Sequence, residues 1–83
     1  MKITVRYFAS IREAMGTGSE VLDTSALTLG QLRDELIARD GAAAQVLARG
    51  RAVRMALNQV MGDEAAALAD GAEVAFFPPV TGG

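Results

Sequence analysis

Apolar and polar residues alternate over the first stretch of the chain. Ile3, Val5 and Tyr7 are separated by polar residues, which predicts a half-buried strand over Lys2 to Phe8. The three apolar residues are expected to face a core. Phe8 breaks the alternation, so it either begins a bend or contacts a partner.

A short helix and a second strand are predicted next. Ser10 and Glu13 have the spacing of a capping box, in which a serine accepts from the third backbone N–H of the helix. Gly16 and Gly18 would end this helix soon afterwards. Ser19–Asp23 is apolar at its centre, and we expect it to pair with the first strand in the antiparallel sense.

The longest amphipathic segment predicts the main helix. Thr28 and Gln31 form a second capping box, and the helix should end near Gly41. Glu35 and Arg39 are spaced for an ion pair on the solvent side. The apolar face, which recurs at helical spacing and should cover a sheet, consists of Leu29, Leu32, Leu36 and Ile37.

The second half of the chain leaves three points open. Residues 42–48 predict one or two further helical turns. Residues 53–61 are either one kinked strand or a hairpin turning at Asn58, and Met61 within them is either a core residue or an adaptable contact. Three nearby arginines form either a solvated face or a contact for an acidic partner: Arg49, Arg51 and Arg54.

The last predicted strand is Glu73–Phe77. Val74 and Phe76 share one face, and if they enter the core, Phe77 points outward. An outward aromatic residue beside a projecting tail suits a partner surface.

This order of elements predicts an α+β fold. Strand, short helix, strand, long helix and then two or three strands would form a mixed sheet packed on one main helix. That is the arrangement of the ubiquitin-like β-grasp. We expect a β-grasp domain over residues 1–77 and an extended C-terminal tail over residues 78–83.

The tail has a distinctive composition. The prolines at 78–79 favour extended backbone, as do the β-branched Val80 and Thr81. From Val80 onward the chain can reach about 13 Å. Gly82 and Gly83 lack a Cβ and fit a narrow channel, and the carboxyl of Gly83 is ionised at neutral pH. Small residues at a chain end often have no role.

Composition excludes several functions. The sequence holds no cysteine and no histidine, which removes thiol nucleophiles and the commonest metal ligands, and we expect no metal site. Basic residues are scattered and the net charge is −2, which argues against nucleic-acid binding. We find no membrane span and no signal peptide, so a cytoplasmic protein is expected.

The C-terminal sequence is the most specific motif. Residues 70–83 read D-G-A-E-V-A-F-F-P-P-V-T-G-G. This resembles the ending of the MoaD/ThiS family of sulfur carriers, and of its MoaD branch most closely, with Ala72 where an aspartate is usual. Residues 5–9 and 11–13 resemble the family's first strand and helix, and residues 58–59 match a family turn.

The resemblance implies a carrier that is activated by other proteins. A MoeB-like adenylating enzyme would use ATP to join AMP to the carboxyl of Gly83, and a sulfur donor protein would convert the adduct to a thiocarboxylate. A MoaE-like large subunit, in a two-plus-two assembly, would then use that sulfur to build the dithiolene of molybdopterin. The chain itself would bind no cofactor and supply no catalytic side chain.

Partner contacts are expected at four positions of the domain and along the tail. Those residues are Phe8, Arg12, Met61 and Phe77, together with Pro79, Val80, Thr81, Gly82 and Gly83.

Three alternatives remain. The first is a ThiS-like carrier for thiamine thiazole synthesis, against which the doubled aromatic and doubled proline weigh. The second is a ubiquitin-like modifier that forms isopeptide bonds through Gly83; Lys2 is the only lysine, which weighs against chains built on internal lysines. The third is an interaction domain with an inert tail.

Overall fold

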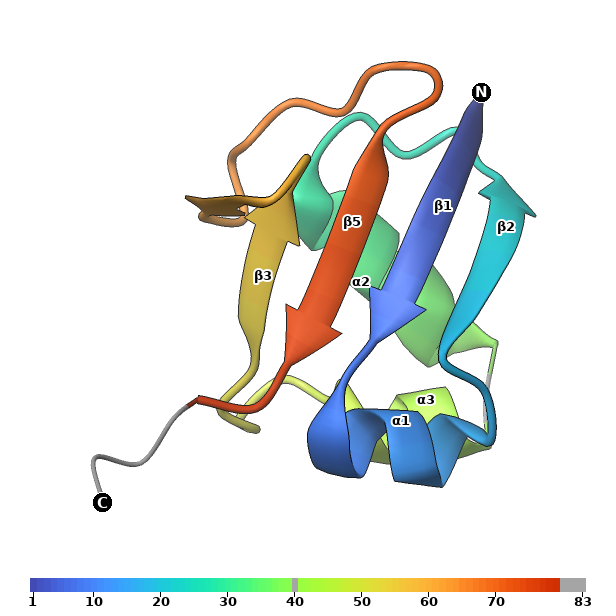
Figure 1. The fold of residues 1–83 in the computed structure, drawn as a ribbon, viewed down its shortest axis with the longest axis vertical. Coiled ribbons are helices and arrows are strands. Elements are labelled where there is room, and N and C mark those ends of the chain that lie inside the picture. Colours follow the sequence, from blue (N-terminus) through green and yellow to red (C-terminus); the bar gives the residue numbers. More distant parts are fainter. Residues whose placement is uncertain (40, 80–83) are drawn as a thin grey trace.

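The chain folds around one mixed sheet (Figure 1). The computed structural model describes residues 1–39 and 41–79. Within them the strands are β1 (Lys2–Tyr7), β2 (Ser19–Asp23), β3 (Arg54–Leu57), β4 (Val60–Gly62) and β5 (Glu73–Phe77). The helices are α1 (Ala9–Met15), α2 (Leu29–Ala38) and α3 (Ala42–Val46).

The two ends of the sequence meet at the centre of the sheet. The strand order is β2-β1-β5-β3-β4. β1 and β5 pair in the parallel sense, with Tyr7 opposite Phe76, and the other pairs are antiparallel. This mixed sheet, crossed on one face by α2, confirms the predicted β-grasp fold.

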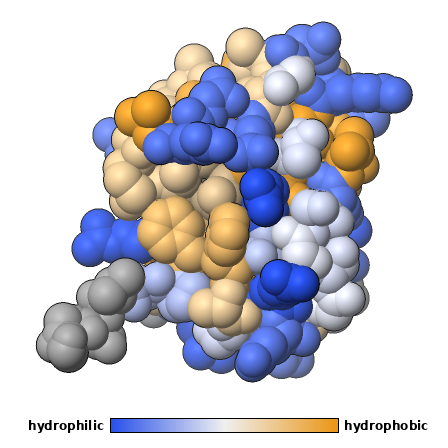
Figure 2. All heavy atoms as spheres, viewed as in Figure 1, coloured by the Kyte–Doolittle hydropathy of each residue, from blue (hydrophilic) through white to orange (hydrophobic). Residues whose placement is uncertain are grey.

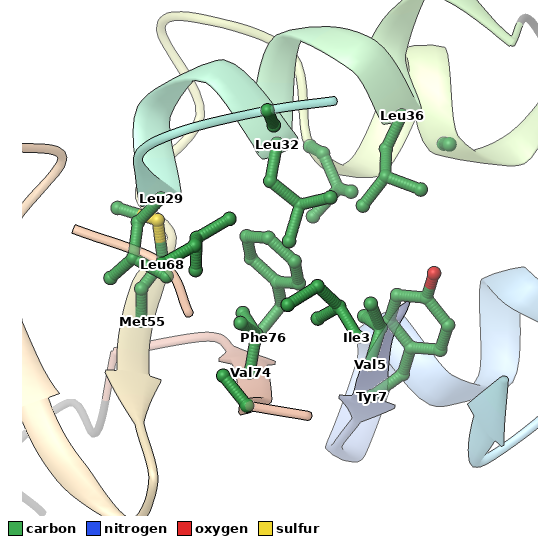
Figure 3. Close-up of a cluster of buried hydrophobic side chains, with 14 of the residues drawn as sticks. Ile3, Val5, Tyr7, Leu29, Leu32, Leu36, Met55, Leu68, Val74 and Phe76 are labelled. Carbon is green, nitrogen blue, oxygen red and sulfur yellow. The ribbon is translucent and has the colours of Figure 1, made fainter. Parts of the chain in front are cut away.

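The core lies between the sheet and α2, as the apolar pattern predicted (Figure 3). Leu29, Leu32 and Leu36 of α2 are fully buried. They pack against buried side chains of β1 and β5. Those strand residues are Ile3, Val5, Tyr7, Val74 and Phe76.

The predicted caps have different outcomes. Thr28 caps α2 and its hydroxyl accepts from the backbone N–H of Gln31, as expected. The predicted cap at Ser10 is wrong, because α1 begins at Ala9 with Phe8 as its N-cap and no side-chain cap bond. Ala9 has a φ of 52°, which turns the chain into the helix earlier than the capping box implied.

The segment between β3 and β4 is a tight hairpin. Asn58 and Gln59 have φ values of 50° and 68°, the left-handed backbone that a two-residue type I′ turn requires. The Asn58 side chain accepts from the backbone N–H of Glu73, which ties the turn to the start of β5. The hairpin alternative is therefore confirmed.

A buried arginine holds the segment after α3 against α2. Arg33 is 5% exposed and donates to the carbonyl oxygens of Leu47, Ala48 and Arg51. Burial lowers the pKa of its guanidinium from the ordinary value, and neighbouring positive charge adds to that effect. The backbone carbonyls nevertheless compensate for the lost hydration.

Arg49 is an exposed member of the same cluster. It pairs with Asp34 and Glu64 and donates to the carbonyl oxygen of Gly30, and its hydrogen bonds to the two carboxylates raise its pKa. These contacts within the chain favour a solvated face at Arg49 over a contact for an acidic partner.

We expect Arg33→Met to lower the free energy of unfolding by about 2–4 kcal/mol, because it leaves the buried carbonyl oxygen of Leu47 without its side-chain donor and removes the part-buried bonds to Ala48 and Arg51. Urea denaturation measures this change. Arg49→Met is the matched control and should cost about 1 kcal/mol or less, since its ion pairs face solvent. Equal losses in the two variants would contradict the role of Arg33.

Candidate functional site

Two aromatic side chains meet on the outer face of the sheet, where β1 and β5 end. The parallel register stacks Tyr7 on Phe76 inside the core, with ring centroids 6.4 Å apart. The next residue of each strand turns to the outer face. Phe8 and Phe77 contact each other edge to face there, at 6.5 Å, a favourable geometry for aromatic pairs.

This pair forms the wall of an open hollow. Figure 2 shows apolar atoms gathered on this face of the sheet, with hydrophilic residues around them. Phe8 is 40% exposed, although large apolar side chains are usually covered. The residues that line the hollow are Arg6, Phe8, Ala9, Gln59, Glu73, Ala75, Phe77, Pro78 and Pro79.

Charged groups border the apolar surface. The Arg6 guanidinium lies 5.5 Å from the centroid of the Phe8 ring, within the range of a cation–π contact. Its Nη1 is 3.9 Å from Oε2 of Glu73. The hollow thus has an apolar lining, with the positive charge of Arg6 and the negative charge of Glu73 at its edge. This combination suits the binding of a protein segment.

The structure brings together only some of the predicted contact residues. Phe8, Phe77 and Pro79 line the same hollow. Met61 lies on the same face of the sheet, because it pairs with Ala56, which pairs with Ala75. It is 57% exposed, which makes it a surface residue and answers the question left open by the sequence.

Arg12 does not lie in this hollow. It belongs to α1 and lines a separate, shallow depression with Thr17 and Gly18. Its partner contact therefore stays a prediction without support from this geometry. Val80, Thr81, Gly82 and Gly83, which include the position predicted to be reactive, lie outside the described residues.

Sequence reasoning missed six residues of the hollow, which are Arg6, Ala9, Gln59, Glu73, Ala75 and Pro78. Arg6 and Ala75 could have been found, because alternation places them on the outer face with Phe77. Glu73 could have been found in the same way, because it lies two residues before Ala75 and so on the same face of β5. Gln59 carried no such signal, since only the hairpin and its place beside β5 bring it to the hollow.

Tyr7 anchors the strand that presents Phe8. Its hydroxyl donates to Oε2 of Glu20 at 2.7 Å. The other oxygen of Glu20 accepts from Arg39. The predicted pair of Arg39 with Glu35 is therefore wrong, because Arg39 reaches across to β2 while Glu35 accepts from Thr24. Burial and then the Glu20 carboxylate raise the pKa of Tyr7 well above its ordinary value.

The described residues include no candidate metal centre. In residues 1–39 and 41–79 no three or more acidic, cysteine or histidine side chains gather as metal ligands would. The described helices are all too short or too polar to cross a membrane.

The chain is similar to known proteins over its whole length. A model of the ThiS family matches residues 5–83. A relative from Escherichia coli (strain K12), named molybdopterin synthase sulfur carrier subunit, is 40% identical over 98% of this chain and 99% of its own.

Solved structures share the fold. Subunit 1 of the molybdopterin-converting factor of Helicobacter pylori 26695, solved in a complex of subunits 1 and 2, is 27% identical with a TM-score of 0.70 and full coverage of both chains. SAMP1 from Haloferax volcanii is 25% identical with a TM-score of 0.79, again with full coverage of both chains.

The raised pKa of Tyr7 predicts a loss of stability at high pH. As pH rises above about 10, the tyrosine of the unfolded chain loses its proton while the folded chain keeps it. The free energy of unfolding should therefore fall with pH from there upward. Urea denaturation across this range measures the slope, and Tyr7→Phe should remove this part of it.

The ultraviolet absorbance of the single tyrosine provides the control. It should report ionisation in the folded protein only well above pH 10. An unchanged slope in Tyr7→Phe, or ionisation at the ordinary pH, would contradict the assignment.

Proposed function

This chain belongs to the ThiS family, and we propose that it is the sulfur carrier subunit of a molybdopterin synthase. The observation that carries the proposal is the 40% identity, over nearly the full length of both chains, with the carrier subunit of E. coli. The ending at residues 76–83 supports the same branch of the family, because its doubled aromatic and doubled proline weigh against a ThiS-like carrier.

The apolar hollow is proposed to dock on the large subunit. It lies where Pro78 and Pro79 lead out of β5, so a protein bound there would also meet the tail. Exposed aromatic residues in an apolar surface are frequent binding hot spots. The complex of subunits 1 and 2 in the H. pylori structure supports a MoaE-like partner. The two-plus-two assembly is part of the proposal and rests on the family resemblance.

The chemistry is proposed to occur at Gly83. A carboxylate resists attack by a sulfur nucleophile, so it must first be activated. The sequence has no G-x-x-x-x-G-K-[ST] loop for ATP phosphates. A MoeB-like enzyme would therefore form the acyl-adenylate from ATP in the cytoplasm. Sulfur from a donor protein would then displace AMP and leave a thiocarboxylate.

The tail is proposed to act as a narrow arm that enters the partner. Pro79, Val80 and Thr81 favour an extended backbone, and Gly82 adds no side-chain width beside the reacting Gly83. The large subunit would then receive the thiocarboxylate at its own active site, with the domain held at the hollow.

Two other functions use the same tail. A ThiS-like carrier would copurify with a thiazole synthase in place of the large subunit. A protein modifier is a second possibility, since SAMP1, whose name means small archaeal modifier protein 1, shares this fold. Such a modifier would give conjugates that depend on Gly83. Immunoblots of cell extracts separate a ladder of such conjugates from a single unconjugated band.

We expect intact-protein mass spectrometry to find one oxygen replaced by sulfur at Gly83 after expression with a cognate adenylating enzyme and sulfur donor. The shift should be absent without ATP.

Deleting Gly83 should abolish molybdenum-enzyme activity in cells, because the remaining terminus would no longer reach the acceptor. Retained activity would contradict the proposal.

We expect Phe77→Ala to weaken binding to the large subunit by roughly 10- to 100-fold, because it removes an aromatic anchor from the wall of the hollow. Isothermal titration calorimetry measures the dissociation constant. Leu27→Ala is the matched control: Leu27 is 64% exposed and lies before α2, away from the hollow. Equal effects of the two variants would exclude the hollow as the docking site.

A further inference from the structure

Arg6 places a positive charge on the apolar outer face of the sheet. It belongs to β1, which has a neighbouring strand on each side, and it is in register with Ser19 of β2 and Ala75 of β5. Residues in register share a face of the sheet, and both neighbours are small. They leave the Arg6 side chain 47% exposed, at the surface that a docking partner would cover.

Two contacts hold the guanidinium of Arg6 beside the hollow. Its Cζ lies 5.5 Å from the centroid of the Phe8 ring, and its Nη1 lies 3.9 Å from Oε2 of Glu73. Hydrogen bonds between charged groups measure about 2.7–2.9 Å, so the contact with Glu73 is electrostatic only. It satisfies none of the N–H donors of Arg6.

Other arginines of the chain are bonded more closely. Nη1 of Arg39, for example, donates to Oε1 of Glu20 at 3.1 Å. Within residues 1–39 and 41–79 the side chain of Arg6 donates no hydrogen bond, and its contacts with charged and aromatic groups are the two described above. The hydrogen-bonding capacity of Arg6 is thus not used in this part of the chain.

A second arginine gives this region of the outer face a positive balance. Arg54 of β3 is exposed and in register with Phe77, so it lies on the same face, on the other side of β5. The charges around the aromatic pair are then those of Arg6 and Arg54 against that of Glu73, although the whole chain has a net charge of −2. Such a region favours an anionic group on a partner and disfavours a cationic one.

A partner that covers the hollow must also cover Arg6, because Arg6 is one of the residues that line it. Removing a guanidinium from water costs free energy unless acceptors replace the lost hydration. A carboxylate replaces it best, since its two oxygens match the planar fork of the guanidinium. The contact with the Phe8 ring restricts the guanidinium before binding, so less conformational entropy is lost when the pair forms.

We propose that Arg6 is a specificity residue of the hollow, which selects a partner segment that carries an aspartate or a glutamate beside its apolar contacts. This inference rests on the proposed function, because the large subunit is the partner concerned. The carboxylate pairs with Arg6 while apolar side chains of the same segment cover Phe8 and Phe77. A segment without an acidic residue would bury Arg6 without an acceptor and bind more weakly.

The test compares two variants that each remove one positive charge from β1. Arg6→Met keeps an apolar stem, and Lys2→Met is the matched control, because Lys2 is exposed on the same strand but does not line the hollow. In isothermal titration calorimetry with the cognate large subunit, the dissociation constant should rise roughly tenfold for Arg6→Met and stay within about twofold of the wild type for Lys2→Met. Equal effects of the two variants would overturn the proposal.

A double-mutant cycle identifies the carboxylate. Aspartates and glutamates of the large subunit are changed one at a time to asparagine or glutamine, and each variant is titrated with the wild-type carrier and with Arg6→Met. We expect one such substitution to weaken binding of the wild type by roughly tenfold and to have little further effect on Arg6→Met, because both variants remove the same pair. If no acidic position of the large subunit is coupled to Arg6, the proposal is wrong.

Two controls separate this contact from folding and from the proposed function. Arg6→Met should unfold at nearly the same urea concentration as the wild type, because its pair with Glu73 faces solvent. Arg6→Lys should recover only part of the affinity, since an ammonium lacks the planar fork. If the wild type did not bind the large subunit, the proposed function would fall and this contact with it. If the wild type binds and Arg6→Met binds equally well, only the inference about Arg6 falls.

Discussion

The parallel pairing of β1 with β5 is the constraint on which the structure depends. It joins the first and last strands of the domain at the centre of the sheet, with Tyr7 opposite Phe76. Because side chains alternate between the faces of a strand, this register fixes both faces together. The inner face receives the stacked aromatic pair, and the following residues, Phe8 and Phe77, meet on the outer face.

The same pairing sets the direction of the tail. Parallel strands end at the same edge of a sheet, so the tail begins beside the turn into α1. A hollow that forms at that edge includes Pro78 and Pro79, with which the tail begins. The place of the proposed docking surface thus follows from this pairing.

The polar contacts keep this frame in place while the outer face stays available. Arg33 donates to three backbone carbonyl oxygens in the segment that follows α3. Tyr7, the last residue of β1, donates a hydrogen bond to Glu20. In the part of the chain that the structure describes, no buried side-chain nitrogen or oxygen lacks a hydrogen-bond partner. Phe8 and Met61 are among the large apolar side chains that stay exposed.

The sequence predicted most of the elements and the inner face of the sheet, because these depend on local periodicity and on residue type, while the chemistry at Gly83 stays a prediction. Alternation in β1 and β5 and the leucine spacing of α2 identified the core, and the aromatic–proline–glycine ending identified the kind of carrier. Only the tertiary structure decided the start of α1 at Ala9, the partner of Arg39 and the place of Gln59 in the hollow. Each of these depends on contacts between residues distant in sequence, which no local pattern encodes.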